Sequence, residues 1–60
     1  MTYKELYNNA WESEYPKVYD SKEQELLAAG MDASFASDEA ASHARLEAES
    51  YAKMIARNYC

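Results

Sequence analysis

Alanine recurs at every fourth position over the C-terminal part of this chain, and this repeat constrains the fold more than any other feature. On a helix with about 3.6 residues per turn, each four-residue step turns by about 40°, so the methyl groups form one inclined ridge. Such a ridge lets a second helix approach closely, and it predicts packing at a crossing angle near about −50°. The plainer alternative is that alanine only favours helix. The repeat comprises Ala36, Ala40, Ala44, Ala48, Ala52 and Ala56.

The chain has 60 residues, with one glycine, one proline and one cysteine. A chain of this length forms at most one small domain, here residues 1–60, whose core is marginal without a disulfide, a metal, close helix packing or a partner subunit. One cysteine excludes an internal disulfide, and no cysteine–histidine cluster suggests zinc. Few residues are β-branched, which favours an all-α fold. We therefore expect close helix packing, completed by self-association into a homodimer.

The first helix has a clear start signal and an equally clear stop signal. Thr2 with Glu5 three residues later is typical of a capping box. Pro16 predicts the end of the helix, because the residue before a proline is pushed out of the α region. The sequence therefore predicts a helix over about residues 2–15, followed by a short extended connector over 16–20.

Two more helices are predicted after this connector. The second covers about residues 21–29 and closes at Gly30, the position where a left-handed residue commonly ends a helix. Ser37, followed by acidic residues, predicts the start of the last helix, which covers about 37–58. The intervening residues 31–36 are either a loop or a helical turn begun by the aspartate within them. Two to three helices of these lengths form a helical hairpin or a small bundle.

The small residues of the last helix describe a groove that a bulky side chain should cover. Large residues follow small ones along the neighbouring face, so the groove is tapered. Tyr7 and Trp11 of the first helix, from the same chain or from a second copy, are the candidates to lie over its small end. The predicted helix-packing and self-association surface comprises Tyr7, Trp11, Ala40, Ala44, Ala48, Tyr51, Ala52 and Ile55.

Six tyrosines and one tryptophan are more aromatic side chains than so small a core can hide. Tyrosine and tryptophan dominate binding hot spots, because they give large, stiff contact areas with a polar tip. Tyr15 and Tyr19 flank the proline in the predicted connector, where we expect them to be displayed. Leu46 falls on the polar side of the last helix and forms a mixed patch with two basic residues. The predicted partner-binding residues are Tyr15, Tyr19, Leu46, Lys53 and Arg57.

The sequence offers little that could carry chemistry. Glu39, His43 and Glu47 stand at four-residue steps, but a solvated histidine–glutamate pair explains them better than a metal site does. Cys60 has no histidine near it in sequence; it is incidental, or it cross-links two copies under oxidation. A single glycine leaves no room for a phosphate-binding loop. We expect no catalytic residue, no metal and no cofactor.

The net charge is −5, and the acids are concentrated in residues 1–39. Direct nucleic-acid binding needs a basic face, so it is disfavoured. No apolar run approaches the roughly 20 residues that cross a bilayer, and no signal-peptide core is present, so no membrane is expected and the location is cytoplasmic.

These features predict a non-enzymatic, acidic protein-binding module, such as a regulator or inhibitor of a larger protein; virus-encoded regulators are one class of this form. One alternative is an acidic mimic of nucleic acid that blocks a DNA- or RNA-binding protein. Another is a structural subunit of a larger assembly.

Overall fold

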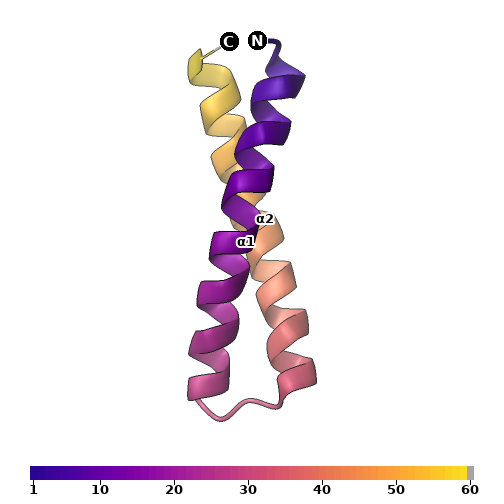
Figure 1. Ribbon diagram of the computed structural model, residues 1–60, viewed down its shortest axis with the longest axis vertical. Coiled ribbons are helices and arrows are strands. Elements are labelled where there is room, and N and C mark those ends of the chain that lie inside the picture. The colour runs from indigo at the N-terminus through magenta and orange to yellow at the C-terminus, as the bar shows by residue number, and fades with distance from the viewer. Residues whose placement is uncertain (60) are drawn as a thin grey trace.

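The computed structural model describes residues 1–59, which form a hairpin of two long antiparallel helices (Figure 1). Helix α1 spans Tyr3–Ala28 and helix α2 spans Ala33–Tyr59. The hairpin is a rod of 42 × 14 × 13 Å. The first turns of α1 and the last turns of α2 lie together at its open end, opposite the loop (Figure 1). The expected all-α fold is confirmed, in its hairpin form.

The prediction that Pro16 ends the first helix is wrong. Helix α1 runs through Pro16 without a break, so the predicted helices over 2–15 and 21–29 and the connector between them form one element. A proline inside a helix removes one backbone hydrogen bond and bends the helix away from its ring. Pro16 is exposed, on the outer side of α1, so a bend at this position is expected to be directed toward α2. Packing against α2 on both sides of the proline overrides the local preference to stop.

The predicted caps of α1 are confirmed. The Oγ1 atom of Thr2 accepts a hydrogen bond from the Glu5 amide at 3.2 Å, and the Glu5 carboxylate accepts one from the Thr2 amide at 3.3 Å. Gly30 follows the other end with a φ of 91°. Its amide donates to the carbonyl of Leu27 at 3.0 Å, and the next amide donates to the carbonyl of Leu26 at 3.1 Å. This pair of bonds is a Schellman motif, which satisfies carbonyls that the helix leaves free.

Replacing Gly30 by alanine should destabilise the hairpin by about 1–2 kcal/mol, because an L side chain resists the left-handed backbone region. A Cβ atom at this position would meet nothing within 4 Å, so the expected loss is entirely conformational. Gly30→Asn is the matched control and should lose less, since asparagine tolerates this region better. Urea unfolding measures both; equal stability of the alanine variant and the wild type would contradict the prediction.

The predicted start of the last helix at Ser37 is also wrong, and the alternative of an earlier helical turn is confirmed. Helix α2 begins at Ala33. The carboxylate of Asp32 accepts a hydrogen bond from the Ser34 amide at 3.1 Å, and its carbonyl accepts one from the Ala36 amide at 2.8 Å. Asp32 therefore acts as the N-terminal cap.

The six repeated alanines of α2, which we call the alanine seam, face α1 and are completely buried. Each has an exposed fraction of 0%, and the only other buried residue in the part that the structure describes is Ala10 of α1, at 9%. No large side chain among these residues is fully buried. The prediction of tight packing along the repeat is thereby confirmed, and the core of this hairpin consists of methyl groups.

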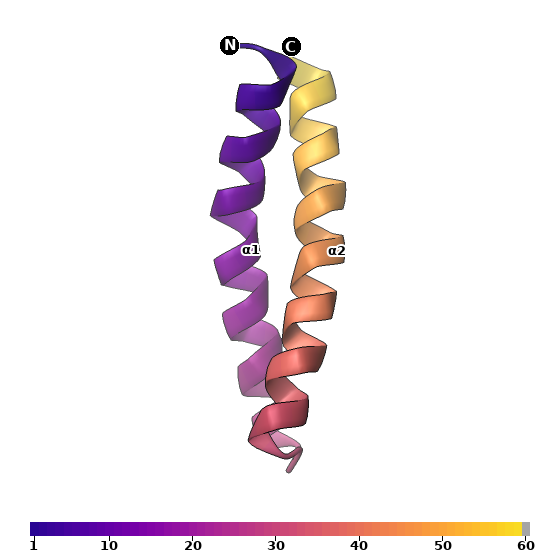
Figure 2. The same cartoon turned by 90° about the vertical axis from the view of Figure 1, so that its right-hand side faces the viewer.

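The course of the alanine seam explains how the two helices cross. Four residues exceed one turn of about 3.6, so the seam drifts around α2 in a right-handed sense, by about 200° from Ala36 to Ala56. Helix α1 follows the drift: it lies to the right of α2 at the open end, passes in front, and lies to the left near the loop (Figure 1). Figure 2 shows the two helices side by side over their length. The crossing has the hand of the predicted −50° class, but the helices stay in contact along the whole seam.

Helix α1 has the same four-residue period. All of its partly or fully buried residues fall on two adjacent columns. Because both helices repeat every four residues, the same positions of the two helices face each other from one end of the hairpin to the other. The first column is Leu6, Ala10, Glu14, Val18, Lys22 and Leu26, and the second is Tyr7, Trp11, Tyr15, Tyr19 and Glu23.

Candidate protein-binding surface

Five aromatic residues follow one another at four-residue steps on α1, with stacking between the first two rings and among the last three, and we call them the aromatic ladder. The rings of Trp11 and Tyr15 are stacked, with centroids 4.8 Å apart and planes within 13°. The rings of Tyr15 and Tyr19, which lie before and after the proline, stack with centroids 6.0 Å apart. The rings of Tyr3 and Tyr7 stack with centroids 6.3 Å apart. The ladder exists because α1 does not stop at Pro16. Its members are Tyr3, Tyr7, Trp11, Tyr15 and Tyr19.

Tyr19 ties the ladder to α2. Its hydroxyl lies 2.7 Å from the Oγ atom of Ser37 and donates to the carboxylate of Glu23 at 3.2 Å. Ser37, which the sequence suggested as a helix start, instead forms a side-chain bond between the helices. The loop end of the ladder is therefore held in place by polar contacts, in addition to stacking.

Tyr7 lies in the part of the ladder near the open end, and its environment disfavours the phenolate. Partial burial raises the pKa of Tyr7 above its ordinary value, and the nearby carboxylate of Glu49 and the ring of Tyr3 add to this. Because the helices are antiparallel and Tyr19 contacts Ser37, this part of the ladder lies along the second half of α2.

Raising the pH above about 10 should weaken the hairpin partly through Tyr7. A phenol whose pKa is raised on folding contributes stability below its unfolded pKa of about 10, and this stability is lost as the pH rises further. Tyr7→Phe removes this titrating group, so the free energy of unfolding should fall less steeply with pH in the variant. The check is the free energy of unfolding in urea at pH 8 and at pH 11; parallel pH profiles for the two proteins would contradict it.

One aromatic residue of α1 forms a hydrogen bond with the first half of α2, and it is neither of the two predicted candidates. Tyr7 and Trp11 were the candidates, but the antiparallel hairpin places Tyr7 near Glu49, in the second half. Tyr19 is the residue that reaches the first half, through Ser37. The other large residues predicted for this surface, Tyr51 and Ile55, are half-buried, as are both original candidates.

The predicted partner-binding residues do not form one cluster. Tyr15 and Tyr19 are half-buried helical residues of the ladder, which corrects their placement in a displayed connector. Leu46 is 66% exposed and lies on the far side of α2 from the alanine seam. Lys53 and Arg57 are exposed in the last turns of α2, toward the open end, whereas Tyr19 lies toward the loop. The structure thus offers two separate surfaces.

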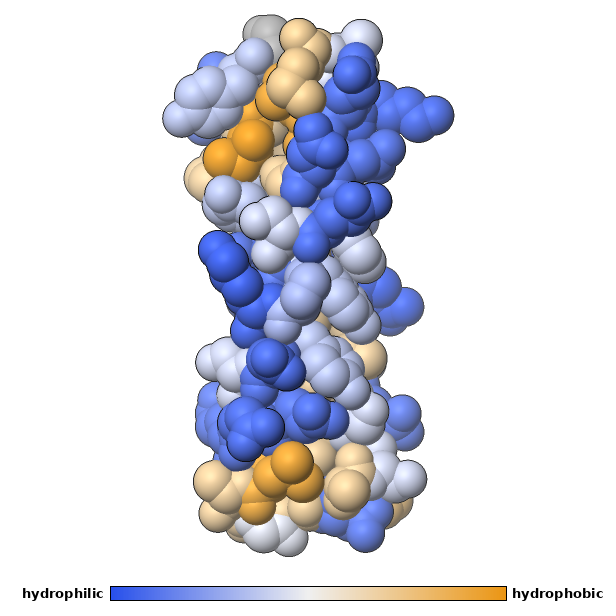
Figure 3. All heavy atoms as spheres, in the orientation of Figure 1, coloured by the Kyte–Doolittle hydropathy of each residue, from blue (hydrophilic) through white to orange (hydrophobic). Residues whose placement is uncertain are grey.

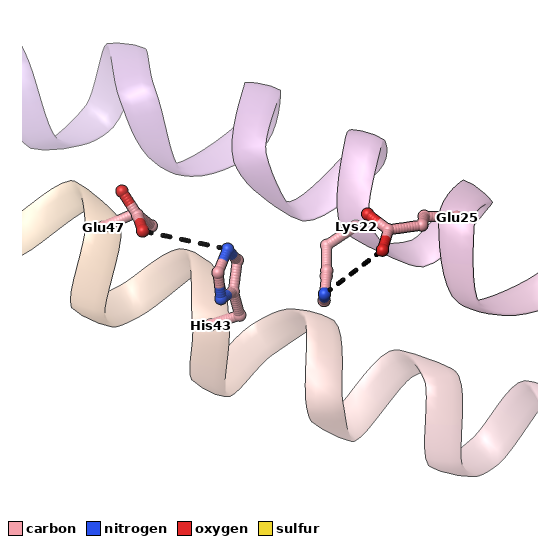
Figure 4. Close-up of polar contacts among 4 residues, drawn as sticks. All are labelled: Lys22, Glu25, His43 and Glu47. Carbon is pink, nitrogen blue, oxygen red and sulfur yellow. Dashed lines mark hydrogen bonds and ion pairs between the residues drawn. The ribbon is translucent and has the colours of Figure 1, made fainter.

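A shallow, open groove of about 400 Å³ lies between the helices near residues of mixed charge. Figure 4 shows two ion pairs there, each within its own helix: Lys22 with Glu25 at 3.5 Å on α1, and His43 with Glu47 at 3.9 Å on α2. All four side chains are at least a quarter exposed, so these pairs contribute little to stability. The groove is lined by Glu14, Lys17, Val18, Ser21, Lys22, Glu25, His43 and Glu47.

The structure brings no metal-binding set together. Among residues 1–59, no group of three or more histidine, cysteine, aspartate or glutamate residues is placed to hold a metal ion. The column of Glu39, His43 and Glu47 supplies only the histidine–glutamate pair already described. The predictions for Cys60 fall outside the described residues.

Large apolar side chains gather at the two ends of the hairpin surface. Figure 3 shows orange areas near the loop and near the open end, with a mostly hydrophilic stretch between them. Leu27, Met31 and Phe35 are exposed at the loop end, and Met1 and Met54 are exposed toward the open end. Neither helix, over the residues that the structure describes, is long and apolar enough to cross a membrane.

The aromatic ladder is the feature that sequence reasoning missed. Its signal was present, because the five aromatic residues repeat with the same four-residue step as the alanines. Dividing the chain at Pro16 hid the repeat.

Comparison with protein-family models, characterised proteins and solved structures gives no match for this chain.

Proposed function

We propose that this chain is a non-enzymatic protein-binding module, a regulator or inhibitor that contacts a larger protein through the aromatic ladder and the acidic residues beside it. One observation carries the proposal: the helix interface is filled by alanines, so every large apolar or aromatic side chain of the described residues keeps some exposure. A fold that needed these side chains only for its core would bury them. Their exposed parts supply the contact area on which protein recognition depends.

The aromatic ladder is well prepared for binding. Stacking orders its rings before any partner arrives, and Tyr19 is further fixed by Ser37 and Glu23. Ordered side chains lose little conformational entropy on binding, so more of the contact energy remains as affinity.

Acidic residues next to the ladder favour a partner with basic residues around its contact site. Glu12 and Asp20 each follow a ladder position by one residue, and both are exposed. Opposite charges at the rim of an interface raise the association rate and select among partners. The excess of acids on α1 thus contributes to specificity more than to affinity.

For the alternative of a nucleic-acid mimic, the placement of the acids on one helix is favourable, but their spacing is not. Glu5, Glu12, Glu23 and Glu25 all belong to α1. Three of them, at steps of 7 and 11 residues, share one face. These steps correspond to about 10 and 16 Å, whereas duplex DNA carries one charge per about 1.7 Å. The acids are too sparse to imitate a phosphate backbone.

Affinity capture from the cells that produce this protein, followed by mass spectrometry, tests the proposal. The wild type is compared with a Tyr15→Ala, Tyr19→Ala double variant and with Phe35→Ala, a control that removes an aromatic ring outside the ladder. We expect a protein that the wild type and the control retain at least tenfold better than the double variant does.

Two checks accompany this experiment. Circular dichroism establishes that the double variant is folded; if it is not, Glu12→Lys with Asp20→Lys replaces it, because both side chains are exposed. Equal recovery with a folded double variant contradicts the proposal. Recovery that falls steeply with salt and ignores the tyrosines supports the mimic instead.

A further inference from the structure

A second row of residues runs along α2 on the side away from the alanine seam. Leu46 stands two residues from both Ala44 and Ala48, and it therefore points away from α1. The row through Leu46 has the same four-residue step as the seam, and every member is exposed, with Leu46 at 66% and Met54 at 49%. We call it the outer row; it comprises Asp38, Ser42, Leu46, Ser50 and Met54.

The outer row is complementary to itself when two copies run antiparallel. If the pair is centred on Ala48, Leu46 of one copy lies opposite Ser50 of the other. Each leucine then meets a small side chain, which is the arrangement that lets rows of side chains interdigitate. Ser42 and Met54 are turned by about 60° to opposite sides of this line, so they lie outside the contact. A parallel pair would place Leu46 on Leu46 and Ser50 on Ser50, without this fit.

Charges next to the outer row are complementary in the same register. Glu39 and Arg57 are separated by 18 residues, about five turns, so they lie on one line of the helix surface, close to that of Leu46. Each is nine residues from Ala48. An antiparallel pair centred there places Glu39 of each copy opposite Arg57 of the other. Both are exposed, and no ion pair within the described residues uses either of them.

The distribution of charge between the helices favours α2 as the contact. Helix α1 carries six acids and three bases, a net charge of −3, whereas α2 carries four acids and three bases, a net charge of −1. Two chains of net charge −5 repel each other. Contact through α2 places the nearly neutral helices together and the acidic helices apart, so the repulsion is smallest in this arrangement.

We propose that a second copy of this chain binds the outer row, and that the protein is an antiparallel dimer joined α2 to α2. The dimer has two Leu46–Ser50 contacts and two Glu39–Arg57 ion pairs related by a twofold axis. Each copy keeps its own aromatic ladder on α1. The inference goes beyond the proposed function and does not depend on it, because the ladder is not part of the contact.

Sedimentation equilibrium of the full chain over a range of concentrations tests the dimer. We expect a reversible monomer–dimer equilibrium for the wild type, and at least a hundredfold weaker association for Leu46→Glu. Leu27→Glu introduces the same change at an exposed leucine of α1 and should associate as the wild type does. A wild type that stays monomeric at millimolar concentration, or association unaffected by Leu46→Glu, overturns the inference.

Charge reversal tests the register. Glu39→Arg alone and Arg57→Glu alone should each weaken association about tenfold, because each replaces two attractions by two repulsions. The double variant carrying both reversals should return to within about threefold of the wild type. Failure of the double variant to recover overturns the antiparallel register.

Cysteine cross-linking in a Cys60→Ser background gives an independent measurement of the register. A mixture of Leu46→Cys and Ser50→Cys chains should form the mixed disulfide faster than either homodimeric one, since these two positions lie opposite each other. Faster formation of the Leu46→Cys homodimer would indicate a parallel pair and overturn the inference. Partner capture by the aromatic ladder is measured separately, so failure of one proposal leaves the other standing.

Discussion

Replacing Ala48 by leucine should destabilise the hairpin by about 1–3 kcal/mol, because the larger side chain forces the two helices apart. Ala48 has no exposed surface and lies in the middle of the alanine seam. The facing part of α1 therefore cannot move aside for a larger side chain without losing its contacts with the rest of the seam. Ala44→Leu should have a similar effect. Small domains are stable by only a few kcal/mol, so either change removes a large fraction of the total stability.

The measurement is the free energy of unfolding from urea titration, followed by circular dichroism. Leucine and alanine both favour helix strongly, so the substitution changes volume far more than helix propensity. Ala28→Leu, at an exposed position of α1, is the matched control and should stay within about 0.5 kcal/mol of the wild type. Unchanged stability of Ala48→Leu would mean that the alanines serve only as helix formers.

The alanine seam could be predicted from the sequence because its signal is periodic. A repeat of Ala36, Ala40 and their successors specifies a helix, a buried ridge and the hand of the crossing, each from geometry alone. The cap at Thr2 and the left-handed Gly30 were equally readable, since both depend on residues next to one another in the chain. Features that are local or periodic need no knowledge of tertiary contacts.

Pro16 and Ser37 were misread for the same physical reason. Each carries a local preference, for stopping or starting a helix, that is worth a few kcal/mol at most. Packing between the helices outweighs it: residues of α1 on both sides of Pro16 are partly buried, and Ser37 forms a hydrogen bond with Tyr19. The Tyr19–Ser37 contact joins residues 18 positions apart in sequence, and a rule based on neighbouring residues cannot weigh it.

The error at Pro16 also affected the binding surface predicted from the sequence. With the helix ended at Pro16, Tyr15 and Tyr19 became isolated aromatic residues of a connector, and the common step that joins them to Trp11 was lost. Their selection as contact residues is still a prediction, now with a surface to test it on. Leu46 and Arg57 were selected for another reason; Leu46 belongs to the outer row, and Arg57 lies next to it.

A core of methyl groups has a consequence for how the protein is stabilised. Alanine burial removes little apolar surface from water, so the hairpin gains less from its core than a bundle packed with leucine does. Any partner that binds only the folded chain stabilises it by mass action. Both surfaces, the aromatic ladder and the outer row, would therefore add stability when occupied, and the unfolding midpoint should rise with protein concentration if the dimer forms.

Replacing Pro16 by alanine should stabilise the hairpin, by about 2 kcal/mol. A proline inside a helix costs about 3 kcal/mol relative to alanine, through the missing hydrogen bond and the clash with the preceding turn. Part of that gain, about 0.4–1 kcal/mol, is lost because alanine gives the unfolded chain more freedom. Lys17→Ala, at the next exposed position, is the matched control and should change the stability by less than about 0.5 kcal/mol.

Urea unfolding of the Pro16→Ala variant distinguishes two roles for the bend. If the proline is only tolerated, the variant gains the expected stability, and α1 follows the alanine seam as a smoothly curved helix. If the bend is needed for α1 to follow a seam that drifts by about 200°, straightening the helix separates it from one half of the seam. Stability then falls instead of rising, and the right-handed crossing depends on Pro16 as much as on the alanines.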